Sequence, residues 1–149
     1  MLAALLLAAA APQTPQAFVT QLYARYRDER FSPFHHIDTI FAPPLARAIR
    51  LDQKLAGPGA IGALDGDPIC DCQDSDGLRA DVGAPLQSNH QTIIPVVLHF
   101  SGEPHTVGHS LKLIWTSNGW RIADTDINGS KSLLAFLNKA NAEAAGRRP

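Results

Sequence analysis

Residues 65–74 carry most of the groups that could do chemistry in this chain. They include four aspartates and both cysteines of the 149-residue sequence, and Asp76 follows shortly after. Carboxylates this close repel one another unless solvent, a cation or hydrogen-bond donors surround them. The segment therefore predicts a loop that binds a ligand or partner. Its candidate binding residues are Asp65, Asp67, Asp71, Gln73 and Asp74.

A metal ion is one use for such a loop, but the ligand set does not fit one. Carboxylates suit calcium or magnesium, whereas thiolates suit zinc or copper, and the loop mixes the two. The aspartate spacing does not follow a helix-loop-helix calcium motif, and no second cysteine pair completes a zinc site. We therefore expect no metal and no other cofactor. For the segment itself we favour a structural role, because aspartates in turns accept hydrogen bonds from backbone N–H groups.

Cys70 and Cys72 are the two cysteines of the chain. In an oxidising compartment two thiols usually pair. One intervening residue would make a small, strained ring that is easily reduced, so redox chemistry is one reading of the pair. The others are a locally tolerated bond and two free thiols, and the sequence leaves all three open.

A second candidate site comes from a predicted hairpin. A two-residue turn at 118–119 would set Leu113 opposite Asp124, on the apolar side of the strands, together with His109. A carboxylate beside an imidazole can transfer protons. We name no catalytic residue outright, but Asp124 and His109 are the candidates for an enzymatic alternative. A bulge after Ile122 would instead turn Asp124 to the other face.

The elements that position these residues follow from periodicity. Thr14 and Pro15 begin one helix, and a second runs from Pro44 to the glycines that start at Gly57. Beyond the acidic loop the period changes from helical to two. Four strands are expected, and Ser130 or Ser132 caps a last helix. The expected strands are 78–86, 92–100, 106–116 and 120–127.

This order predicts an α+β fold: N-terminal helices, a curved four-stranded antiparallel meander and a C-terminal helix. We expect one domain over residues 12–141 and a frayed tail over 142–149. Residues 1–11 form an apolar run too short to span a membrane and typical of a secretory signal, although no Lys or Arg occurs before Arg25. The expected product is periplasmic or secreted, with no membrane span.

Charge restricts the partners. The net charge is −1 at pH 7, with no basic field that would attract nucleic acid. We therefore expect a protein or small-molecule partner and no nucleic acid.

Several short motifs occur in a characteristic order. They are Asp67-Pro68-Ile69, Gln73-Asp74, Trp120-Arg-Ile-Ala-Asp124 and Ser132-Leu133-Leu134. With them the chain, from Phe18 to Leu137, resembles a bacterial family of exported domains of unknown function. The resemblance implies a bacterial envelope setting and the cone-shaped α+β fold of nuclear transport factor 2, which is also cystatin-like. It implies no activity.

These observations favour a non-enzymatic binding domain of the bacterial envelope. A specific version is an inhibitor or immunity protein whose acidic loop blocks a basic partner surface. One alternative is an enzyme or small-molecule binder with a cone pocket that uses Asp124 and His109. The other is a structural envelope component in which the acidic loop is only a turn.

Overall fold

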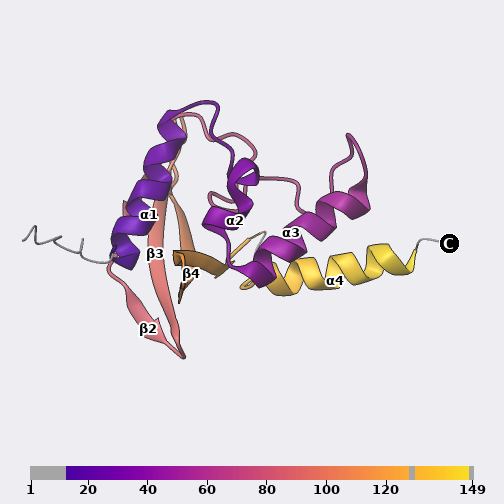
Figure 1. Ribbon diagram of the computed structural model, residues 1–149. Coiled ribbons are helices and arrows are strands. Elements are labelled where there is room, and N and C mark those ends of the chain that lie inside the picture. The colour runs from indigo at the N-terminus through magenta and orange to yellow at the C-terminus, as the bar shows by residue number, and fades with distance from the viewer. Residues whose placement is uncertain (1–12, 128–129, 148–149) are drawn as a thin grey trace, which may run out of the picture.

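The N-terminal part of the chain is helical, as the sequence predicts (Figure 1). The computed structural model describes residues 13–127 and 130–147, so the proposed signal segment at 1–11 lies outside the described residues. Helix α1 spans Pro15–Ala24 and continues into the 3-10 turn η1, Arg25–Arg27. The Thr14 hydroxyl caps α1 by accepting the N–H of Ala17 at 3.1 Å.

Three further helical segments precede the acidic loop. The 3-10 turn η2 (Pro33–His36) leads into the short α2 (Ile37–Ile40), and α3 (Pro43–Ala56) follows. Two prolines open α3, where missing N–H groups cost nothing. Gly57, at φ 89°, ends it. One face of α3 is apolar and buried, which fixes the helix against the rest of the core.

The sheet has five antiparallel strands rather than the four expected. Their order is β1-β3-β4-β5, with β2 also paired to β3. The predicted strand 78–86 is in fact two strands, because Pro95 of β3 offers no N–H at the middle of the pairing and Gly83 lies close against it. The strands are β1 Arg79–Val82, β2 Leu86–Ser88, β3 Gln91–His99, β4 Val107–Thr116 and β5 Gly119–Thr125.

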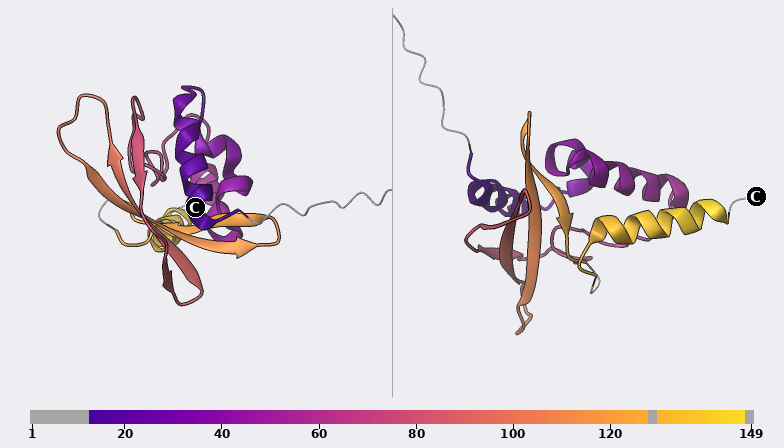
Figure 2. Two further views of the ribbon diagram at one scale, coloured as in Figure 1. Left: turned by 90° about the vertical axis from the view of Figure 1, so that its left-hand side faces the viewer. Right: turned by 90° about the horizontal axis from the view of Figure 1, so that it is seen from below.

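Helix α4 spans Leu133–Gly146 and is capped by the Ser132 hydroxyl, which accepts the N–H of Ala135. The sequence analysis expects a frayed tail over residues 142–149, and the helix extends as far as Gly146. The buried side chain of Asn141 donates to the Ala48 carbonyl at 2.9 Å and ties α4 to α3. The two helices lie side by side (Figures 1 and 2).

The sheet is strongly twisted (Figure 2), with α1 packed against β1 and β3 toward one edge and α3 and α4 packed against β5 at the other. Alternate residues of β3 and β4 are buried with Leu22 and Tyr23 of α1 and Leu45 and Ile49 of α3 in one apolar cluster. The α+β class, the antiparallel sheet and the terminal helices are therefore confirmed. Among the described residues, no helix is long and apolar enough to cross a bilayer.

Candidate functional site

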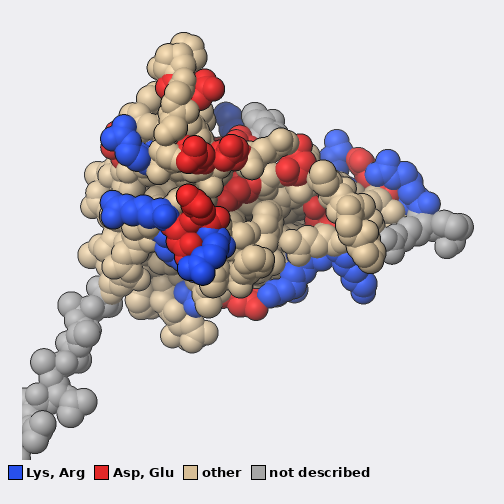
Figure 3. Space-filling view, turned by 90° about the horizontal axis from the view of Figure 1, so that it is seen from above, with Lys and Arg blue, Asp and Glu red and all other residues tan. Residues whose placement is uncertain are grey.

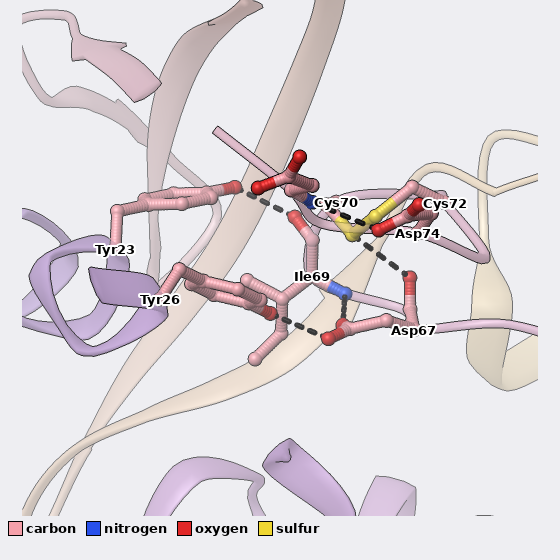
Figure 4. Close-up of a disulfide and its surroundings, with 8 residues drawn as sticks. Tyr23, Tyr26, Asp67, Ile69, Cys70, Cys72 and Asp74 are labelled. Carbon is pink, nitrogen blue, oxygen red and sulfur yellow. Dashed lines mark hydrogen bonds between the residues drawn. A yellow bond between two sulfur atoms is a disulfide. The ribbon is translucent and has the colours of Figure 1, made fainter. Parts of the chain in front are cut away.

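The acidic segment is a compact loop closed by a disulfide (Figure 4). Cys70 and Cys72 are bonded, with Cα atoms 5.1 Å apart. Asp71 between them has φ 50°, a left-handed conformation that aspartate tolerates better than most residues. The backbone N–H of Asp67 donates to the Cys72 carbonyl at 2.8 Å, and the reverse bond is 3.4 Å long. The loop is therefore a small β-bridge around one covalent link.

Two tyrosines from the first helical segment hold this loop from inside. The Tyr23 hydroxyl donates to the Ile69 carbonyl at 2.6 Å, and the Tyr26 hydroxyl donates to Asp67 Oδ2 at 2.7 Å. The other carboxyl oxygen of Asp67 accepts the N–H of Ile69 at 2.8 Å. These contacts come from residues more than forty positions apart in the chain, so tertiary structure alone brings them together.

Asp67 is consequently a half-buried acid whose two carboxyl oxygens are both hydrogen-bonded within the protein. Burial raises the pKa of Asp67 from its usual 3.8, although hydrogen bonds from Tyr26 and from the backbone of Ile69 and Cys70 oppose the shift. Burial and the nearby Asp67 carboxylate likewise raise the pKa of both Tyr23 and Tyr26.

A cleft of about 530 Å³ adjoins the loop. Three of the five predicted binding residues, Asp65, Asp67 and Gln73, line it, and Cys72 borders it. The wall is of mixed polarity, and its apolar side chains come from the η2 region and from the 57–66 segment. Its apolar members are Phe31, Pro33, Phe34, Ile61 and Leu64.

The other two predicted binding residues lie outside this cleft. Asp71 borders a smaller hollow on the loop, and Asp74 lies in a separate depression with Asp76 and Arg79. Figure 3 shows acidic side chains spread across the middle of the face seen from above, with lysines and arginines beside them. The acids of the loop therefore lie in three different depressions and are not gathered into one site.

The far wall of the cleft depends on one buried acid of α3. Asp52 is 4% exposed, and its carboxyl oxygens accept the N–H groups of Ala63 at 2.9 Å and Leu64 at 3.1 Å. Gly62 packs so closely that a Cβ there would overlap the Asp52 carboxyl group. The 57–66 segment is therefore fixed to the helix by its backbone.

The predicted convergence of Asp124 with His109 is wrong. The hairpin turn forms, but the pairing runs Leu113↔Ile122 and then Lys112↔Asp124. Ala123 is thus an extra, bulged residue, and the bulge considered as an alternative is the one that occurs. Asp124 accepts the N–H of Leu134 at 3.0 Å and lies 3.4 Å from Lys112 Nζ. Its role is to fix the start of α4.

His109 is buried below the acidic loop. Its Nε2 lies 2.8 Å from the Thr125 hydroxyl. Burial lowers the pKa of His109 below its usual 6.5, while Asp126, Asp71 and a hydrogen bond to the backbone of Pro68 act in the opposite direction. His109 therefore links the sheet to the loop as a neutral side chain.

A His109→Gln variant is expected to flatten the pH dependence of stability. The pKa of His109 is lower in the folded than in the unfolded state. Its contribution to the free energy of unfolding is therefore fully present above pH 6.5 and is lost as the pH falls through the pKa of the folded state. Melting temperatures between neutral pH and about pH 5 check this. The wild type should lose more stability over that interval than the variant, and equal losses would contradict the assignment.

Residues that sequence reasoning missed complete the site. Tyr26, Phe31, Phe34 and Ile61 are not among the residues that the sequence predicts for the site, although they contact the loop or line the cleft. Their one signal was an excess of apolar side chains in segments without regular periodicity. In the described part of the chain, no three His, Cys, Asp or Glu side chains are arranged to hold a metal ion.

Comparison with known proteins gives little guidance on function. No protein-family model matches the chain. It is 28% identical over 134 residues to the uncharacterized protein YqhG of Escherichia coli K12, a match that covers 87% of this chain and 43% of YqhG. The chain thus spans less than half of that relative's length. Similarity to an uncharacterised bacterial protein agrees with the expected family of unknown function.

Among solved structures, a phospholipid-binding protein from Ralstonia solanacearum in complex with a phospholipid is similar over 89% of this chain and 76% of its own. The TM-score is 0.38 and the sequence identity 14%. A similarity this low carries no inference about fold or ligand. The nuclear-transport-factor-2-like assignment stays a prediction.

Proposed function

We propose that this protein is a non-enzymatic binding domain whose cleft takes a basic, partly apolar segment of a protein partner. The observation that carries the proposal is the composition of the cleft. The polar residues Asp65, Asp67 and Gln73 line the same cleft as the apolar residues Phe34 and Ile61.

Lysine and arginine side chains match such a cleft, because each has an apolar stem and a cationic head. Asp65 is exposed at the rim, where it can meet the incoming charge. Phe31 already has the Arg25 guanidinium 4.3 Å from its ring centroid and Tyr26 edge-on to it, so it serves as a wall. Phe34 and Ile61 therefore make the apolar contacts with the partner.

Ile61 is the clearest sign of an unused contact surface. It is 76% exposed at the edge of the cleft. An apolar anchor surrounded by polar residues is a common arrangement at protein interfaces. Asp71, Asp74 and Asp76, outside the cleft, would steer a basic partner toward it and so raise the association rate at low salt.

We also propose an exported, envelope location and an inhibitory or immunity role. The Cys70–Cys72 disulfide supports export, since such bonds persist mainly outside the cytosol. An acidic surface around a cleft is suited to cover the basic cleft of a toxin or hydrolase. The enzymatic alternative loses its support because Asp124 and His109 do not meet.

Synthetic peptides test the binding proposal directly. A peptide that combines lysines with phenylalanine should bind, and its glutamate counterpart should not. Asp65→Asn is expected to weaken binding about tenfold, equivalent to about 1.4 kcal/mol, with a smaller effect at high salt. Ile61→Ser should weaken binding without changing its salt dependence. Titration followed by NMR chemical shifts measures both effects.

Glu103→Gln is the matched control, because it removes one negative charge from the exposed turn between β3 and β4, away from the cleft. It should bind as the wild type does. Equal binding of the lysine and glutamate peptides, or equal loss in the Asp65 and Glu103 variants, would refute a cleft that selects basic segments.

A further inference from the structure

We propose that the Cys70–Cys72 pair is a site of thiol–disulfide exchange in which an incoming thiol attacks Cys72. This activity goes beyond the binding role and does not depend on it. It rests on two features of the structure: the two cysteines differ in accessibility, and the loop is held in place by contacts that do not involve the sulfur atoms.

The two cysteines are not equivalent. Cys70 is 1% exposed, inside the apolar cluster. Cys72 is partly exposed and borders both the cleft and the smaller hollow beside Asp71. Because exchange requires direct approach to a sulfur, Cys72 is the one that a thiol can reach. Figure 4 shows the bond on the side of Ile69 that is away from the two tyrosines.

The loop is also held by contacts that do not involve the sulfur atoms, so we expect it to keep its shape when the disulfide is reduced. These contacts are the Asp67–Cys72 backbone pair, the Tyr23 bond to Ile69 and the Tyr26 bond to Asp67. A bond that spans one intervening residue also restricts the unfolded chain very little, since this restriction grows with the length of the closed loop. The bond therefore contributes little to the stability of the fold. Because the loop keeps the reduced Cys70 and Cys72 close together, the two thiols can form the disulfide again in an intramolecular step.

The exchange balances in two steps. A thiolate attacks Cys72 Sγ, the S–S bond breaks, and its electron pair leaves on Cys70 Sγ. The proton that the attacking thiol released to water in the cleft returns to Cys70, whose sulfur lies 3.9 Å from the Asp67 carbonyl oxygen as a hydrogen-bond acceptor. A second thiol then attacks the substrate sulfur and releases Cys72. In sum a pair of thiols is oxidised to a disulfide and the protein gains two electrons and two protons.

The surrounding charges select among thiols. Asp71 separates the two cysteines, and Asp65 and Asp74 lie on either side of the loop. A cationic thiol is therefore concentrated near Cys72, and an anionic one is repelled. Cysteamine should react several-fold faster than glutathione after correction for thiolate fraction, and the ratio should approach one at high salt.

The test uses the oxidised full-length protein without denaturant. It is treated with cysteamine at neutral pH, quenched with acid, and digested for mass spectrometry. We expect a mixed disulfide on Cys72 at least about tenfold more often than on Cys70. The fully reduced protein should keep its circular dichroism spectrum. Reaction only in denaturant, equal labelling of both cysteines, or unfolding on reduction would overturn the proposal.

Single-cysteine variants give an independent measurement. Cys70→Ser leaves Cys72 as a thiol, and Cys72→Ser leaves Cys70. Toward cystamine, the Cys70→Ser protein should react about tenfold faster than its counterpart, with folding of both checked by circular dichroism. Equal rates in two folded variants would also overturn the proposal. If either variant fails to fold, the labelling ratio in the wild type decides.

Discussion

Replacing Asp52 with alanine should destabilise the protein by roughly 3 kcal/mol and open the wall of the cleft. The carboxyl group is buried and accepts two backbone N–H groups, from Ala63 and Leu64. Without it, both donors lose their acceptor in a region that water reaches poorly. For a protein of this size the loss corresponds to a fall in melting temperature of about 6–12 °C.

The controls separate hydrogen bonding from packing. Asp52→Asn keeps one acceptor oxygen and the side-chain volume, so it should lose about half as much stability. Gly62→Ala should also destabilise the protein, because its new Cβ would overlap the Asp52 carboxyl group. Chemical denaturation measures all three variants. A change below about 0.5 kcal/mol in Asp52→Ala would mean that the 57–66 segment is not anchored in this way.

Tyr26→Phe should cost about 2 kcal/mol at neutral pH, because it removes the hydroxyl donor from the partly buried Asp67 carboxylate. Burial raises the pKa of Asp67, so its favourable contribution is present below its usual pKa of 3.8 and is lost as the pH rises through the folded value. The hydroxyl stabilises the charged form. The variant should therefore be more strongly destabilised at neutral pH than in acid.

A double-mutant cycle isolates this interaction. Asp67→Asn removes the charge and keeps an acceptor for the Ile69 N–H group. In that background Tyr26→Phe should cost about 1 kcal/mol less than in the wild type. Denaturation at neutral pH and near pH 4 gives the four free energies of unfolding. Additive losses at both pH values would show that the tyrosine packs against the loop without supporting its charge.

Much of the fold was predictable from local patterns. Thr14 before Pro15 predicts the start of α1, and Gly57 predicts the end of α3, because caps and glycines act on their immediate neighbours. The Asn118-Gly119 turn predicted the hairpin correctly. The bulge at Ala123 reversed the face on which Asp124 lies, and one extra residue in a strand leaves little trace in a sequence.

The sequence by itself determined the α+β class, the antiparallel strands, and the loop that holds both cysteines and most of the candidate acids. Local hydrogen bonding and side-chain periodicity decide those features, and both can be read along the chain. Only the tertiary structure decided which acids are internal. Tyr26 reaches Asp67 across forty-one positions, and Thr125 replaces Asp124 beside His109. The pKa and the hydrogen bonding of a carboxylate depend on its burial and on nearby donors, and residues distant in sequence supply both.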